Sequence, residues 1–151
     1  IEHGIHSNCT WIVGSPTETL EDVKESVRFI LWQTEFYSQF GISPSAVNQR
    51  MFTMTWYPGV TLINNQKVRD TLSRVFKLTF VPIQTSKGKP EWEPVIDKHF
   101  RKYVEELDDA TKVLFDPETG QPLHFSDMTD NEFLKVQECI DENRLFDILS
   151  L

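Results

Sequence analysis

Trp11–Thr19, with the sequence WIVGSPTET, is the stretch that decides the fold of this chain. Its apolar first part predicts a buried strand that stops at Gly14. The Ser-Pro pair predicts a turn, and the Thr-Glu-Thr sequence after it is typical of a helix start. In α/β proteins, ligands bind where the carboxyl end of a strand meets the next helix. The sequence therefore predicts a binding site beside Gly14, unless residues 14–16 serve only as a turn.

The residues around this stretch extend the same pattern. Asn8–Val13 is the predicted strand, and Thr19 with Asp22 forms a capping-box pattern at the start of a helix that ends near Gly41. The apolar face of that helix consists of Leu20, Val23, Val27, Ile30 and Leu31. A strand, a tight turn and an amphipathic helix form half of a βαβ unit, so the sequence predicts a parallel sheet.

The rest of the chain alternates less regularly between the two-residue hydrophobic period of strands and the 3.6-residue period of helices. We expect a second strand at Ala46–Trp56, a helix at Asn65–Phe76 and a short third strand at Leu78–Ile83. From Trp92 onward the pattern is helical, and Thr129–Leu151 begins with another capping box and forms a last helix.

Composition excludes several classes of protein. The 151 residues are 39% hydrophobic and 25% charged, as in soluble globular domains. A net charge of −8 argues against nucleic-acid binding, which relies on basic surfaces. No apolar run approaches the roughly 18 residues that cross a membrane. The two cysteines, Cys9 and Cys139, are far apart and form no CxxC pair, so we expect reduced thiols and a cytoplasmic location.

Two motifs in the first 63 residues or so carry a resemblance to a family. Residues 2–5 read EHGI and precede the WIVGSPTET stretch, and residues 52–62 read FTMTWYPGVTL. These resemble the fifth and sixth strand regions of radical S-adenosylmethionine (SAM) enzymes, most closely the cobalamin-binding members. There, a Gly-x-Pro-Gly-Glu-Thr turn ends the fifth strand, and Tyr-Pro-Gly-Thr-Pro-Leu follows the sixth. Two departures are Thr17, where the family usually has glycine, and Val60, which precedes Thr61.

The resemblance implies a fold and a set of cofactors. Residues 1–83 would be the C-terminal portion of an α/β barrel, a partial (β/α) barrel remnant with two to three parallel strands, and residues 84–151 a helical extension. The parent enzyme would use SAM, a 4Fe-4S cluster and, in the most similar members, cobalamin. The CxxxCxxC triplet that holds the cluster lies upstream in the family and is absent from this chain. The chain would thus be a C-terminal fragment, inactive alone, whose partner is the upstream part of the same barrel.

The resemblance also implies a set of cofactor-binding residues, while catalytic residues stay unknown and no metal ligand is assigned. The predicted wall of the SAM pocket consists of Ile12, Val13, Gly14, Glu18, Phe52 and Met54. Glu18 would accept a hydrogen bond from the ligand, or else be a first-turn carboxylate that the helix dipole favours.

Another function is compatible with the same sequence. An acidic α/β module without catalytic activity would dock onto a protein partner through exposed aromatic side chains such as Trp92. A barrel fragment would also have an unpaired strand edge, because the strand at Asn8–Val13 would have lost a neighbour. We therefore expect homo-oligomers that form through that strand edge.

Overall fold

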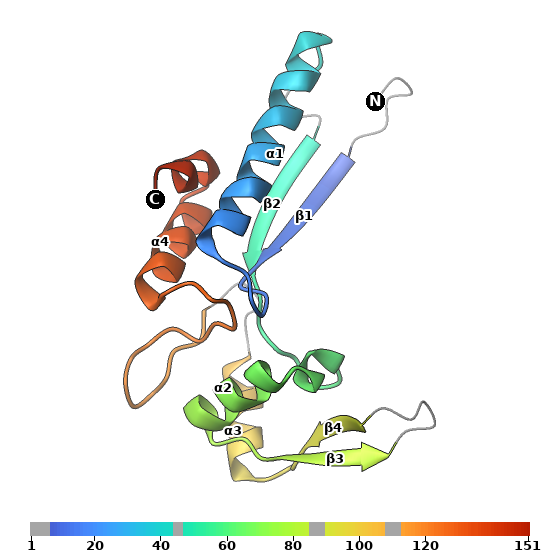
Figure 1. Cartoon of the computed structure of the whole chain (residues 1–151), viewed down its shortest axis with the longest axis vertical. Coiled ribbons are helices and arrows are strands. Elements are labelled where there is room, and N and C mark those ends of the chain that lie inside the picture. The colour runs from blue at the N-terminus through green and yellow to red at the C-terminus, as the bar shows by residue number, and fades with distance from the viewer. Residues whose placement is uncertain (1–6, 44–46, 85–89, 108–112) are drawn as a thin grey trace. The chain divides into compact units, whose positions relative to one another are not determined.

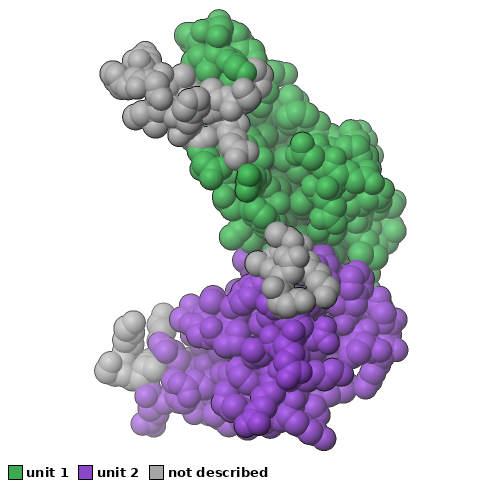
Figure 2. All heavy atoms as spheres, turned by 180° about the vertical axis from the view of Figure 1, so that it is seen from behind, with its two compact units in different colours: residues 1–53, 126–151 green, residues 54–125 purple. Residues whose placement is uncertain are grey.

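The computed structural model describes residues 7–43, 47–84, 90–107 and 113–151 and divides into two compact units (Figure 2). The first unit consists of residues 1–53 and 126–151, and the second of residues 54–125. The two units are groups of residues that contact one another more than they contact the rest of the chain. The division predicted after residue 83 is of another kind, because it separates a barrel portion from a helical extension, and it stays a prediction. Residues 2–5 of the first motif lie outside the described residues.

A parallel βαβ unit forms the centre of the first unit, as the sequence predicts. β1 (Ser7–Val13) pairs in parallel with β2 (Val47–Thr53), and α1 (Leu20–Gln39) connects them (Figure 1). The predicted capping box is present, since the Thr19 hydroxyl accepts the Asp22 N–H and the Asp22 carboxylate accepts the Thr19 N–H. β2 is shorter than expected, because the chain leaves the strand after Thr53.

The C-terminal residues complete the core of the first unit. α4 (Asp130–Asp141) contacts β2, and the 3-10 helix η3 (Leu145–Ser150) contacts α1. The buried apolar side chains include Val13, Val23, Val27, Ile30, Met51, Phe133, Val136 and Ile148. The single helix expected over 129–151 is wrong: Asn143 has a φ of 55°, and this left-handed backbone ends the helical path before η3.

The second unit combines helices with an antiparallel hairpin. Its elements are η2 (Thr61–Asn64), α2 (Gln66–Phe76), β3 (Phe80–Gln84), β4 (Pro90–Pro94) and α3 (Lys98–Glu106). The helix expected at 65–76 is confirmed. The third strand exists, but it pairs antiparallel with β4 and not with the parallel sheet. The helical stretch expected from Trp92 is confirmed only in part, because α3 begins at Lys98 and Trp92 lies in β4. Pro94 disfavours the helical conformation of the residue before it, so the helix does not begin at Trp92.

Trp56 and Tyr103 form the centre of the second unit's core. Both side chains are fully buried, and their rings stack with centroids 5.6 Å apart. The Tyr103 hydroxyl donates to the Trp56 carbonyl at 2.7 Å, and the Trp56 indole N–H donates to the Val60 carbonyl at 3.1 Å. Burial raises the pKa of Tyr103 well above its usual range. Trp56, expected on a strand, is instead a core anchor of this unit.

The described residues therefore form a mixed α/β protein with two two-stranded sheets, one parallel and one antiparallel. Of the expected two to three parallel strands, two are present. None of the described helices is both long enough and apolar enough to span a membrane.

Candidate functional site

The turn after β1 is held by the side chain of Glu18. One oxygen of its carboxylate, Oε2, accepts the backbone N–H groups of both Gly14 and Ser15, the latter at 3.2 Å. The Glu18 N–H donates back to the Ser15 carbonyl at 3.1 Å, and its own carbonyl accepts the Asp127 N–H at 2.8 Å. Burial of this carboxyl raises its pKa, while the two backbone hydrogen bonds oppose that shift. Glu18 precedes the N-cap of α1 and closes the turn.

Two positions in this turn require left-handed backbone. Gly14 has a φ of 96° and Thr17 a φ of 73°. Glycine adopts such angles at no steric cost, whereas a β-branched residue adopts them rarely. Thr17 therefore occupies a position that favours glycine.

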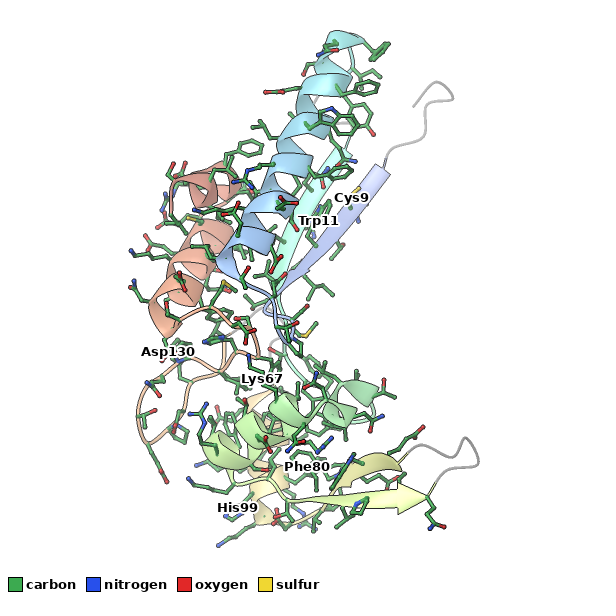
Figure 3. All side chains as sticks on the ribbon, viewed as in Figure 1. Cys9, Trp11, Lys67, Phe80, His99 and Asp130 are labelled. Atoms are coloured by element: carbon green, nitrogen blue, oxygen red, sulfur yellow. The ribbon has the colours of Figure 1, made fainter. Side chains whose placement is uncertain are left out.

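The two faces of the parallel sheet differ in what covers them. Trp11 lies on β1 (Figure 3). On one face of the sheet, the centroid of its ring lies 5.8 Å from that of Phe29 of α1, and Gln49 links the Trp11 indole to Gln33 of α1. Val13, which is 2% exposed, lies on this covered face. On the other face, Ile12 is 55% exposed and stands in register with Phe52.

The six predicted site residues are thus divided. Ile12 and Phe52 share the open face of the sheet, and Gly14 with Glu18 forms the turn at its carboxyl end. The Val13 side chain is buried, so only its backbone can meet a ligand. Met54 belongs to the second unit and packs against the core around Trp56.

A row of aromatic side chains runs along α1 to its C-cap residue, Phe40. Phe29, Trp32, Phe36 and Phe40 are 45%, 53%, 41% and 65% exposed, and successive ring centroids lie 5.5, 5.4 and 5.0 Å apart. We call these four residues the aromatic stripe. Spacings of three, four and four residues were the available signal, because they place all four on one helix face.

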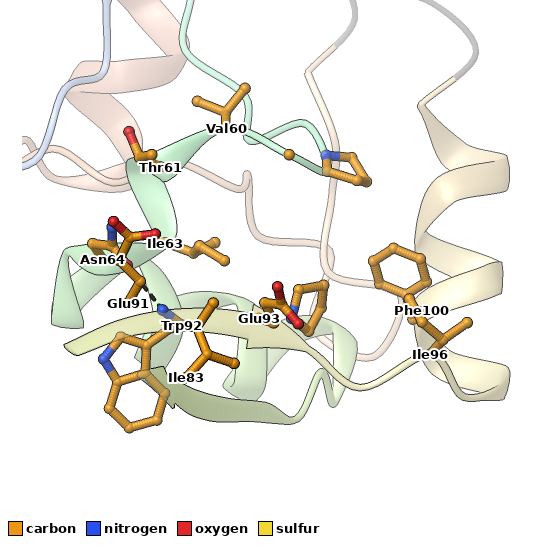
Figure 4. A pocket seen from close by; sticks show the side chains of 13 residues that line it. Val60, Thr61, Ile63, Asn64, Ile83, Glu91, Trp92, Glu93, Ile96 and Phe100 are labelled. Atoms are coloured by element: carbon orange, nitrogen blue, oxygen red, sulfur yellow. Dashed lines mark hydrogen bonds between the residues drawn. The ribbon is translucent and has the colours of Figure 1, made fainter. Parts of the chain in front are cut away.

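The second unit contains a cleft of about 390 Å³ between its hairpin, the residues around η2 and the start of α3 (Figure 4). Among the described residues that line it are Glu91 and Glu93, and none of these described residues is basic. Arg69 lies 4.1 Å from the centre of the Trp92 ring and donates to the carbonyls of Ile63 and Asn64. These contacts fix β4 against η2, so the aromatic ring of Trp92 serves the packing of this unit.

Comparisons with protein-family models, with curated proteins and with solved structures find no match to this chain. In the part of the chain that the structure describes, no three His, Cys, Asp or Glu side chains gather in a way that could hold a metal ion. A proposal about function therefore depends on the geometry of the turn and of the sheet.

Proposed function

We propose that the β1–α1–β2 unit is a SAM-binding wall from the C-terminal portion of a radical SAM barrel, with an unknown substrate. One observation carries the proposal: Gly14 and Thr17, the two left-handed positions of the turn, coincide with the two glycines of Gly-x-Pro-Gly-Glu-Thr. The motif's glutamate coincides with Glu18, which closes the turn. A positive φ at both positions is the backbone conformation that glycine suits best, and this supports the proposal.

The exposed side of the sheet supports the same proposal. Parallel strands in α/β proteins are normally covered on both faces, and α1 covers only one face of this sheet. In a barrel the helices lie outside, so the face with Ile12 and Phe52 would be the interior face. Ligands in such folds lie at the carboxyl ends of the strands, which is where Gly14 is found.

The chain fits one of the implied cofactors and not another. The apolar side chains of Ile12 and Phe52, together with the backbone around Gly14, suit one side of an adenine ring. SAM supplies radical chemistry in that family only when it is bound to an iron–sulfur cluster. Such a cluster needs three thiolates, whereas this chain has two cysteines, of which Cys139 is buried in α4. The chain therefore lacks the ligand set for the cluster, and cobalamin stays an expectation from the resemblance.

The experiment is a titration of the ¹⁵N-labelled chain with SAM, followed by amide NMR shifts. We expect weak binding, with shifts concentrated at Ile12, Val13, Gly14 and Phe52, because only one wall of the pocket is present. Gly14→Ala should reduce these shifts. Gly41→Ala is the matched control, because Gly41 also has a positive φ (69°) but ends α1 away from the turn.

Two outcomes would contradict the proposal. One is the absence of any shift in the β1–α1 turn at millimolar SAM. The other is a set of shifts confined to the second unit.

A protein-interaction module remains the second candidate, and the aromatic stripe is the observation that favours it. Exposed apolar patches of this kind mark interaction surfaces in monomeric proteins. A chain that binds no SAM but binds a protein partner through the aromatic stripe would favour this function.

A further inference from the structure

One side of α1 is covered and the other is open. η3 packs against α1, and α4 packs against η3 and β2, so both lie on the β2 side of the sheet (Figure 1). The aromatic stripe lies on the opposite side of α1, where Phe29 meets the Trp11 ring of β1. The stripe therefore continues from the helix onto the first strand.

The strand below the stripe has an open edge as well. Within residues 7–43, 47–84, 90–107 and 113–151, β1 pairs with β2 alone, so the N–H and C=O groups along its other edge face away from the sheet. Such edges are templates for pairing with another chain. This surface joins the edge of β1 that no described strand occupies to an apolar helix face. It fits a partner of the same construction, namely a strand with a helix on the same face.

We propose that this surface is a self-association interface and that a second copy of the chain occupies it. A two-fold axis perpendicular to the sheet would pair β1 antiparallel with β1 of the other copy. The same axis keeps both α1 helices on one face of the resulting four-stranded sheet, so the two aromatic stripes meet. One two-fold axis therefore both pairs the strand edges and brings the aromatic stripes together, as in an isologous dimer, where the same surface of each copy meets.

The exposed area approaches that of a specific dimer interface. Each ring of the stripe has a surface of roughly 150–250 Å² and is about half exposed, so the four rings leave about 400 Å² uncovered per copy. Two copies would bury about 800 Å² from the rings alone. The strand edges, Trp11 and the flanking helix surface bring the total towards the roughly 1,200 Å² at which specific interfaces begin.

This dimer is independent of the proposed SAM site. SAM binding at the Gly14 turn can fail while the dimer forms, and the reverse also holds.

Sedimentation of the full chain over about 1–200 μM tests the proposal. We expect a reversible dimer, and we expect Trp32→Lys and Phe36→Lys each to raise the dissociation constant at least about 100-fold, because a charge would be buried at the two-fold axis. Leu134→Lys is the matched control, since Leu134 is also exposed (39%) and lies on α4 of the same unit. Both α1 positions are exposed, so circular dichroism should show an unchanged fold.

Hydrogen exchange gives the second measurement. The amides along the outer edge of β1 should become protected as the dimer forms, and this protection should be lost in Trp32→Lys. A monomer at 200 μM would overturn the proposal. A dimer that Leu134→Lys weakens as much as the α1 variants, or one that leaves the β1 amides unprotected, would also overturn it.

Discussion

At the scale of single residues, the turn after β1 is governed by backbone conformation. Gly14 and Thr17 both have positive φ, and the Glu18 carboxylate satisfies the N–H groups that the turn exposes. Glycine meets this requirement at Gly14 without cost, whereas Thr17 keeps its conformation only because the surrounding turn imposes it.

We expect Thr17→Gly to raise the free energy of unfolding by about 1 kcal/mol. A left-handed backbone costs a non-glycine residue about 1–2 kcal/mol, and the greater freedom of glycine in the unfolded chain cancels part of the gain. Urea unfolding measures the change. The control is Thr34→Gly in the middle of α1, which should lower stability; a similar loss in both variants would contradict the prediction.

The Glu18 carboxyl predicts a pH dependence. Burial raises its pKa above the ordinary value of 4.5, so the folded chain holds this proton more tightly than the unfolded chain does. The resulting stabilisation is complete below the unfolded-state pKa and is lost as the pH rises through the folded-state pKa. Wild type should therefore lose stability relative to Glu18→Gln between about pH 4 and about pH 7. Thermal melts of both proteins measure this difference, with Glu25→Gln as the control; a constant difference across the range would refute the prediction.

At the scale of elements, local signals predicted those whose ends are marked by side chains. β1, α1 and α2 were predicted because a strand run, a capping box and a helical apolar face coincide with their bounds. β4 was not predicted, because Pro90–Pro94 has no strand pattern of its own and forms a strand only through its antiparallel pairing with β3. The short third strand was assigned to the parallel sheet because sequence periodicity does not reveal a strand's partner.

α3 provides a test at this scale. Asp97 caps it, and one carboxylate oxygen accepts the N–H groups of His99 and Phe100 at 2.9 Å each. Asp97→Ala should lower the free energy of unfolding of the second unit by about 1 kcal/mol, and Asp97→Ser should restore most of it. Hydrogen exchange in the α3 amides measures the effect. Equal protection in Asp97→Ala and wild type would show that the cap does not stabilise α3.

At the scale of the whole molecule, two cores divide the chain in a way that chain order does not suggest. The C-terminal helix α4 completes the first unit, although the whole second unit separates it from β2 in the sequence. Of the predicted site residues, five belong to the first unit and Met54 to the second.

The intact chain should bind no iron–sulfur cluster. After anaerobic reconstitution with iron and sulfide, we expect no stoichiometric iron and no cleavage of SAM under reducing conditions, because three thiolates are not present in the chain. Iron and sulfide assays with a SAM-cleavage assay check this outcome. Stoichiometric retention of both elements would mean that the chain assembles a cluster without the expected motif.

The sequence by itself determined the βαβ unit, the capping of its helix and the presence of a turn that begins at Gly14. The cap and the turn depend on residues within one or two helical turns of each other, where backbone preference and hydrogen-bonding reach act directly. The βαβ unit follows from the order strand, helix, strand, because a helical crossover joins parallel neighbours. Only the tertiary structure decided that Val13 is buried while Ile12 is open, that Trp56 anchors a separate core, and that the aromatic stripe stays exposed. These outcomes depend on which distant surfaces meet, and burial between segments far apart in the chain has no local signature.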